Sequence, residues 1–154
     1  MLSNFSYPII STDDYVRTVN FYEDHFDFTP EFELPQFSIL KRQGYNSSFI
    51  AVVDKNHTSL PKPYQAQTKG MILHLPVSNV DSSYQQFYWE GLQIISEPVV
   101  APNIGVKHFY VEDPSGTLIC VAEAVDYGNL DAFSIMDELR ARQEDYNKES
   151  ADCS

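Results

Sequence analysis

Few residues of this chain combine the types and spacing that enzyme chemistry requires. The sequence has no Gly-x-Ser-x-Gly nucleophile motif and no His-Glu-x-x-His zinc motif, and its six glycines are scattered rather than gathered in a phosphate-binding loop. The acidic residues form no obvious catalytic pair, and their commonest role is a solvated face. These observations give no support to hydrolase, phosphate-binding or zinc-protease chemistry.

Two reactive residue types, His74 and Cys120, fall in stretches that are typical of β-strands. One histidine without carboxylate partners is a poor metal site, and a half-buried cysteine is usually an inert small hydrophobe. A reactive thiol would need a neighbouring base or cation to lower its pKa. His74 is therefore a candidate for lining a cavity, whereas Cys120 is a packing residue or, as the alternative, a functional thiol.

The other three histidines lie in different settings. His108 falls in a further strand, where the alternation of side chains points it either toward a ligand or outward. His57 lies in a polar connector and is expected to be a solvated loop residue. His25 is close to the end of a predicted helix, where a positive charge is favourable, so a structural role is expected.

The composition describes an acidic globular chain. It has 154 residues, of which 43% are apolar, and a net charge of −12. The charge argues against nucleic acid and anionic membrane surfaces as partners, and it weakly favours cationic or neutral ligands. No stretch approaches the ~20 apolar residues of a membrane helix, and the first residues do not resemble a signal peptide. Two cysteines do not suggest a disulfide framework, so we expect a cytoplasmic protein.

The first half of the chain predicts one helix among several short strands. Residues 7–11 indicate a strand, after which Ser11, Thr12 and Asp13 offer helix caps. Apolar residues then recur every three or four positions between residues 14 and 26, at Tyr15, Val19, Tyr22 and Phe26, which is typical of an amphipathic helix. Thr29-Pro30 helps to end this helix. Three strands are expected next, at residues 31–34, 37–40 and 48–53, followed by a polar connector at residues 54–69.

The second half repeats the same order of elements. A strand is expected at residues 71–77, a helix from about Val80 to Trp89, and strands at residues 93–95, 108–111 and 118–122. A shift of 66 positions places Phe21-Tyr22 on Phe87-Tyr88. Each half is too small to bury both faces of its own sheet, so the two halves should pack together. We predict an α+β fold in which residues 1–125 form two paired modules, about 5–55 and 70–125, with the linker at 54–69.

The C-terminal residues, 126–154, lie outside this repeat. Apolar residues among charged ones predict a short amphipathic helix from Asp131 to Tyr146, packed on its own domain or on a partner. The residues from Asn147 to Ser154 are expected to form a flexible tail.

Several segments, taken in order, resemble the vicinal oxygen chelate superfamily. Phe21-Tyr22-Glu23-Asp24 followed by Phe26-Asp27-Phe28 is similar to the end of its first helix, although Asp27 stands where that family usually has Gly. Residues 109–116, Phe-Tyr-Val-Glu-Asp-Pro-Ser-Gly, resemble its Phe-x-x-x-Asp-Pro-x-Gly signature. Val77-Ser78-Asn79-Val80-Asp81 resembles the start of its second unit, and Ala51-Val52-Val53 the end of its first. The resemblance covers roughly residues 5–125.

This resemblance implies two βαβββ modules whose curled sheets form a cup. It also implies a homodimer, in which modules pair within one chain or across two. The superfamily includes glyoxalase I, extradiol dioxygenases, and bleomycin and fosfomycin resistance proteins. In its enzymes the cup holds a divalent metal, with His, Gln or Glu ligands from the first and last strand of each module.

The four positions that the resemblance assigns to metal ligands carry unsuitable side chains. They fall on Tyr7, Phe49, Ile72 and Cys120. Phe and Ile cannot bind a metal, Tyr binds iron only in special settings, and the carboxylates that a hard cation needs are absent. If Ile72 occupies its position, His74 points to the same side two residues further on.

We therefore expect a small-molecule-binding protein without metal or other cofactor, similar to the bleomycin resistance proteins. The expected ligand is aromatic or cationic and lies in the cup or in a dimer cleft, lined by Tyr7, Phe49, Ile72, His74, His108 and Cys120. The alternative is a metal-dependent lyase, isomerase or dioxygenase of the same superfamily. A structural or interaction role with an unused cup also remains open.

Overall fold

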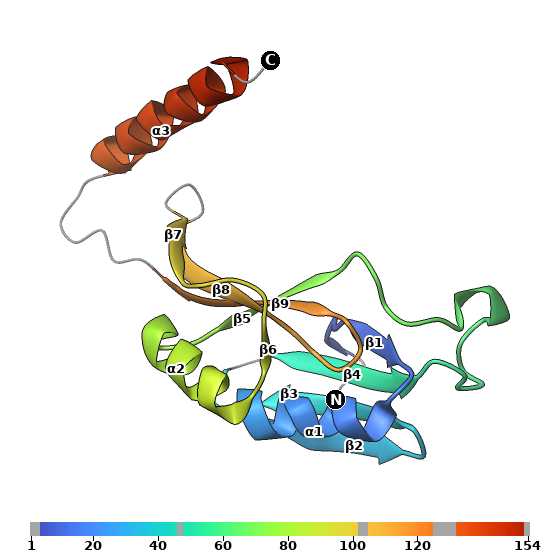
Figure 1. Cartoon of the computed structure of the whole chain (residues 1–154). Coiled ribbons are helices and arrows are strands. Elements are labelled where there is room, and N and C mark those ends of the chain that lie inside the picture. The colour runs from blue at the N-terminus through green and yellow to red at the C-terminus, as the bar shows by residue number, and fades with distance from the viewer. Residues whose placement is uncertain (1–3, 46–47, 102–104, 125–131, 153–154) are drawn as a thin grey trace.

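The computed structural model contains two mixed β-sheets, each accompanied by a helix, and a third helix at its C-terminal end (Figure 1). It describes residues 4–45, 48–101, 105–124 and 132–152. The elements are, in chain order, β1 (Ile9–Thr12), α1 (Tyr15–Phe26), β2 (Phe28–Leu34), β3 (Phe37–Arg42), β4 (Phe49–Asp54), a 3-10 turn (Lys62–Tyr64), β5 (Ile72–Pro76), α2 (Val80–Glu90), β6 (Gln93–Ile94), β7 (Val99–Ala101), β8 (Val106–Glu112), β9 (Leu118–Ala124) and α3 (Ala132–Asp152).

The two sheets share one topology, which confirms the predicted α+β fold with a repeated strand and helix order. Sheet A has the order β1-β4-β3-β2, and sheet B the order β5-β9-β8-β6, with the short β7 also paired to β8. In each sheet the strand before the helix runs parallel to the last strand, β1 with β4 and β5 with β9. The other strand pairs are antiparallel. We call β1–β4 with α1 module 1, and β5–β9 with α2 module 2.

Both module helices begin at a side-chain cap. The carboxylate of Asp14 accepts a hydrogen bond from the Arg17 N–H at the start of α1, so the cap lies one residue after the predicted Ser11–Asp13 segment. The Asn79 side chain accepts from the Ser82 N–H at the start of α2, as expected. These bonds satisfy N–H groups that the first helical turn leaves without a partner.

β2 begins earlier than predicted, at Phe28 instead of residue 31. Asp27 adopts the left-handed conformation, with φ 58°, and its N–H bonds to the Tyr22 carbonyl, so the chain leaves α1 and enters the strand within one residue. Asp tolerates this conformation better than most residues, which explains how it occupies a position typical of Gly. Pro30 is accommodated because β2 is an edge strand with a register shift beside this residue.

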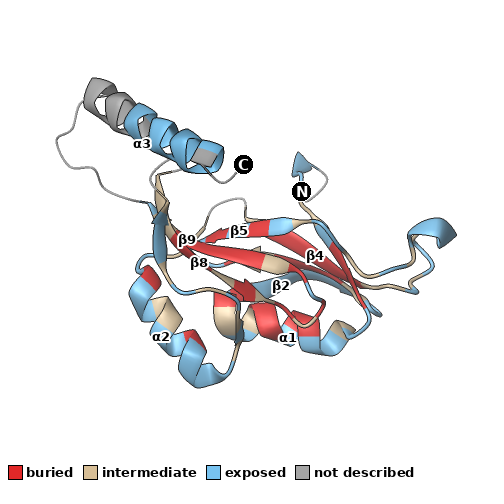
Figure 2. Ribbon diagram, turned by 45° about the horizontal axis from the view of Figure 1, so that its top comes forward, coloured by how far each residue is buried: buried red, intermediate tan, exposed pale blue. Residues whose placement is uncertain are grey.

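The two modules share one hydrophobic core, which lies on the helix side of both sheets (Figure 2). The rings of Phe26 in α1 and Phe87 in α2 lie 5.2 Å apart at their centroids, and both are buried. Phe109 of β8 completes this aromatic contact at 6.1 Å from Phe87. The predicted packing of the two halves therefore takes place through their helices.

A buried hydrogen bond also joins the modules. The Tyr22 hydroxyl of α1 donates to Oδ2 of Asp113, in the turn between β8 and β9, at 2.6 Å. Tyr22 is fully buried and Asp113 nearly so. Burial, together with the adjacent Asp113 carboxylate, raises the pKa of Tyr22 well above its ordinary value, so the hydroxyl keeps its proton and remains a donor.

α3 extends beyond the predicted end of the C-terminal helix, from Ala132 to Asp152 rather than to Tyr146. The helix therefore continues from Asn147 to Asp152, where a flexible tail was expected. Residues 140–151 are exposed, and the apolar side chains near the start of the predicted helix lie outside the described side chains. Within the described part of the chain, no helix is both long and apolar enough to cross a membrane.

Replacing Tyr22 with Phe tests the hydrogen bond between the modules. The variant leaves the buried Asp113 carboxylate one donor short, and hydrogen bonds to charged groups contribute about 1.5–3 kcal/mol. We expect urea unfolding to show a loss of about 2 kcal/mol in the free energy of unfolding. Tyr88→Phe is the matched control, since the Tyr88 side chain is 64% exposed. Equal losses in the two variants would contradict this role of Tyr22.

Candidate functional site

We call the side of each sheet that faces away from its helix the open face. On β5, Leu73 and Leu75 join the core on the helix side, whereas Ile72, His74 and Pro76 alternate with them and are exposed. Because strand residues alternate between faces, Ile72 and His74 lie on the open face of sheet B. The predicted pairing of these two residues on one side of the strand is what the structure shows.

Two further candidate residues share this open face. Cys120 of β9 lies directly opposite His74 of β5 in the strand register, and opposite Tyr110 of β8 on its other side. His108 points the same way, because its neighbour Phe109 belongs to the core on the helix side. The strands thus bring Ile72, His74, His108 and Cys120 together on one face of sheet B.

Tyr110 belongs to this group but was not identified from the sequence. It lies directly opposite Cys120 in the register of β8 and β9. Tyr110 lies two residues after His108, so strand alternation would have placed both on one face if the direction of His108 had been known. Burial raises the pKa of Cys120, and the neighbouring Tyr110 side chain offsets part of that rise. The thiol is therefore protonated at neutral pH, which fits a packing residue rather than a nucleophile.

His108 is the most constrained polar group of this face. Its side chain is 92% buried, and the ring lies 5.2 Å from that of Tyr110, edge to face. Its Nδ1 atom is buried and has no hydrogen-bond partner. A buried polar atom without a partner costs about 1–3 kcal/mol.

Tyr7 and Phe49, the other two candidate residues, lie together on the open face of sheet A. Phe49, Ile39 and Ala51 form a small apolar cluster, against which Tyr7 and Phe37 pack. The Phe5 ring lies 5.1 Å from that of Phe49. The six candidates therefore form two groups on two sheets, and their convergence on one cavity stays a prediction.

The side chains on these faces do not suit a divalent metal. The positions assigned to metal ligands carry one phenol, one thiol and two hydrocarbon side chains, at Tyr7, Cys120, Phe49 and Ile72. Among the described residues, no three or more His, Cys, Asp or Glu side chains lie close enough together to hold a metal ion. A catalytic site of this kind needs about three nitrogen or oxygen ligands, so the residues present do not fit one.

The other two histidines, His25 and His57, lie outside the strands, and the His57 ring lies 6.1 Å from that of Phe37 on sheet A. His25, in the last turn of α1, contacts the Glu90 carboxylate of module 2 at 2.7 Å and so links the two modules. His57, in the connector, bonds to Ser59 at 2.7 Å.

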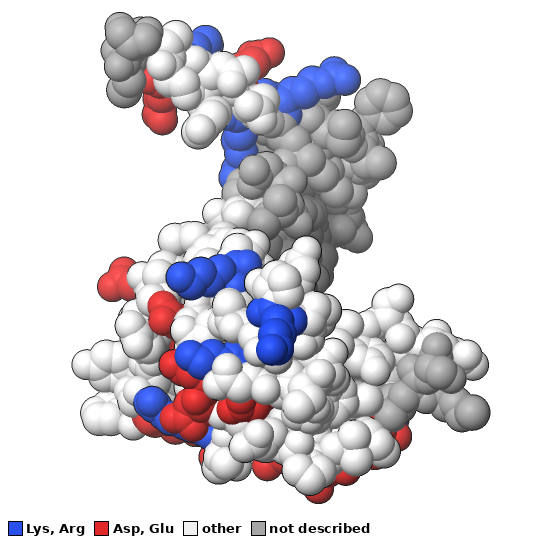
Figure 3. Space-filling view, turned by 90° about the vertical axis from the view of Figure 1, so that its right-hand side faces the viewer, with Lys and Arg blue, Asp and Glu red and all other residues white. Residues whose placement is uncertain are grey.

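The charged side chains show no large patch of one sign on the side of the molecule seen in Figure 3. Basic and acidic groups lie close to each other there, and wide areas between them carry no charge. Although the net charge is −12, this side of the molecule has no continuous acidic surface.

Solved structures with this fold cover most of the chain. A glyoxalase/bleomycin resistance protein/dioxygenase from Nocardioides is 18% identical, with a TM-score of 0.61 over 80% of this chain and 85% of its own. A superfamily member from Sphaerobacter thermophilus is 17% identical, with a TM-score of 0.64 over 77% and 95%. Lactoylglutathione lyase from Agrobacterium tumefaciens is 20% identical, with a TM-score of 0.60 over 77% and 92%. At these identities the likeness shows the fold alone.

The sequence profile of the Glyoxalase/Bleomycin resistance protein/Dioxygenase superfamily matches residues 4–121. The chain belongs to this superfamily, as the resemblance of its motifs indicated. No curated protein matches the chain.

The thiol of Cys120 provides a test of this description. In a Cys153→Ser variant, Cys120 is the one remaining cysteine, since the chain has two. We expect iodoacetamide to alkylate it at pH 7 at least about tenfold more slowly than free cysteine, because burial shields the thiol and raises its pKa. Urea unfolding should restore the ordinary rate. Rapid alkylation of the folded protein would show that the thiol is activated.

Proposed function

We propose that this protein binds a small apolar or amphipathic molecule against the open faces of its sheets, without using a metal. One observation carries the proposal: the positions that the resemblance assigns to the superfamily's metal ligands carry Tyr7, Phe49, Ile72 and Cys120. Ile72 is exposed and Tyr7 half-buried, so these two offer largely apolar contact, whereas Phe49 and Cys120 are buried.

The open face of sheet B offers both an apolar and a polar contact for such a ligand. Ile72 is 56% exposed, and covering apolar surface gains about 25 cal/mol per Å². His74, which is exposed on the same face, supplies a polar contact that would orient the molecule. The aromatic rings of this face, His108 and Tyr110, suit a flat or cationic ligand.

We further propose that a second copy of the chain covers the open faces and encloses the ligand. Several large apolar side chains on these faces are about half exposed, namely Ile9, Phe32, Leu34, Ile72 and Val99. Contiguous exposed apolar surface on a protein marks an interaction site. A twofold dimer covers the same surface on both copies, which makes a second copy the simplest occupant.

No specific observation favours a metal-dependent lyase, isomerase or dioxygenase. The likeness to a lactoylglutathione lyase rests on 20% identity and concerns the fold. A metal-dependent reaction would need donors that the open faces do not bring together in the described structure.

Binding of a neutral apolar dye, Nile red, tests the proposed site. An Ile72→Glu variant places a carboxylate on the open face of sheet B, and we expect it to weaken dye binding at least about tenfold because the ligand would bury an unpaired charge. Ile72 is exposed, so the variant should fold. Ile72→Leu should bind as the original does, and so should Val16→Glu, which changes an exposed residue of α1.

Two outcomes would overturn parts of this proposal. Equal dye binding by the Ile72→Glu and Val16→Glu variants would remove the open face of sheet B as the binding surface. Light scattering of the original chain should give the mass of a dimer, and a monomer at micromolar concentration would refute the proposed second copy.

A further inference from the structure

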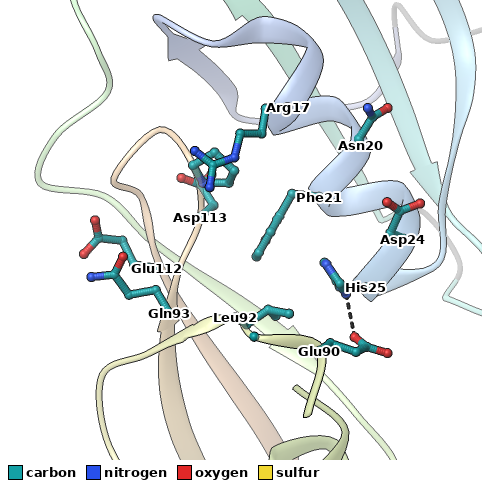
Figure 4. Close-up of a pocket in the computed structure, with 12 residues that line it drawn as sticks. Arg17, Asn20, Phe21, Asp24, His25, Glu90, Leu92, Gln93, Glu112 and Asp113 are labelled. Carbon is teal, nitrogen blue, oxygen red and sulfur yellow. Dashed lines mark hydrogen bonds and ion pairs between the residues drawn. The ribbon is translucent and has the colours of Figure 1, made fainter. Parts of the chain in front are cut away.

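A cleft of about 430 Å³ lies between the two modules, on the helix side and away from the open faces (Figure 4). One wall is a single face of α1, formed by Arg17, Asn20, Phe21, Asp24 and His25. Their spacing of three and four residues places them on one side of the helix. This side of α1 lies next to the side that packs into the hydrophobic core, so α1 contributes residues to both the core and the cleft.

The opposite wall belongs to module 2. It is formed by the end of α2 and the residues after it, including Glu90 and Leu92, by Gln93 of β6, and by Glu112 at the end of β8. Two contacts hold this wall against α1: the 2.6 Å hydrogen bond from Tyr22 to Asp113 and the 2.7 Å contact between His25 and Glu90. The cleft therefore has fixed sides and exists only where the modules meet.

Phe21 gives the cleft an apolar centre. Figure 4 shows its ring projecting from α1 into the space between Arg17 and His25, toward the strands of module 2. The ring packs edge-on against Tyr22 and His25, with centroid distances of 5.2 and 5.3 Å, so its orientation is set by its neighbours. Leu92 adds a second apolar group from module 2.

Polar groups of both signs surround this centre without partners. The side chains of Arg17, Asp24 and Glu112 make no hydrogen bond or ion pair in the described structure, whereas both oxygens of Asp113 are already engaged. Arg17 and Asp24 are seven residues apart on one helix, which separates them by ~10 Å along its axis. One cation and one anion therefore lie near opposite ends of the Phe21 ring. A second carboxylate, that of Glu112, lies on the facing wall.

From this arrangement we infer that the cleft binds a small zwitterion whose ammonium and carboxylate flank an apolar or aromatic body. Arg17 receives the carboxylate through charge-assisted hydrogen bonds, and Asp24, near the other end of the cleft, receives the ammonium. The body of the ligand lies against Phe21 and Leu92, where it covers apolar surface. Neither a simple cation nor a simple anion satisfies both ends of the cleft.

This site is separate from the proposed binding surface on the sheets. It lies between α1 and module 2, and none of the six candidate residues of the open faces lines it. Because its walls come from both modules, a bound ligand bridges them and should stabilise their packing. Binding at the two sites is therefore separable by mutation.

The test is isothermal titration calorimetry of the full chain with three matched probes: 4-(aminomethyl)benzoate, benzylamine and benzoate. The first carries both charges on one aromatic ring, and the other two carry one charge each. We expect the zwitterion to bind at least about tenfold more tightly than either single-charge probe, since each end adds a charge-assisted contact.

Variants assign each charge to its side chain. Arg17→Gln should remove the zwitterion's advantage over benzylamine while leaving benzylamine binding unchanged, and Asp24→Asn should weaken both zwitterion and benzylamine. Arg140→Gln, at an exposed position of α3, is the matched control and should bind as the original chain does. Ile72→Glu should also leave zwitterion binding unchanged.

Three results would overturn the inference. The first is no binding of the zwitterion at millimolar concentration, and the second is equal binding of all three probes. The third is an undiminished preference for the zwitterion in Arg17→Gln, in a variant whose circular dichroism shows it to be folded.

Discussion

The structure depends on the burial of one carboxylate, that of Asp113, between the two modules. An ionised group is costly to remove from water unless its oxygens are hydrogen-bonded. Here Oδ2 accepts from the Tyr22 hydroxyl, while Oδ1 accepts from the backbone and hydroxyl of Ser115 and from the N–H of Thr117. The same group therefore shapes the turn between β8 and β9 and ties that turn to α1.

This arrangement determines which surfaces remain available. Because the modules meet through their helices, both open faces are left for other contacts, and the cleft between α1 and module 2 is formed as a consequence. The apolar positions on the open faces are then directed away from the core. One pattern of packing thus accounts for two separate candidate surfaces with different chemistry.

Local patterns predicted much of the fold, because helix and strand periodicity reflects burial within a few residues. The repeat of Tyr15, Val19, Tyr22 and Phe26 predicted α1. The early start of β2 was missed because it depends on the left-handed conformation of Asp27, which a residue of this type adopts only in some settings. The length of α3 was missed because its second half is polar and lacks a periodic apolar signal.

The candidate site was less accessible from the sequence. Alternation placed His74 beside Ile72, but the direction of His108 required knowing that Phe109 is in the core. Tyr110 followed only from the register that sets it opposite Cys120. The bond between Tyr22 and Asp113 joins residues 91 positions apart, and no local pattern predicts such a contact.

The most direct test of metal-independent ligand binding is native mass spectrometry of the purified chain after incubation with Zn²⁺, Mn²⁺, Ni²⁺ or Fe²⁺ and buffer exchange. The account predicts a dimer without stoichiometric metal, because the open faces of the sheets lack a set of suitable ligands. Retention of about one metal ion per subunit, lost when Tyr7 and Cys120 are replaced by Phe and Ser, would contradict it and would identify these positions as metal ligands.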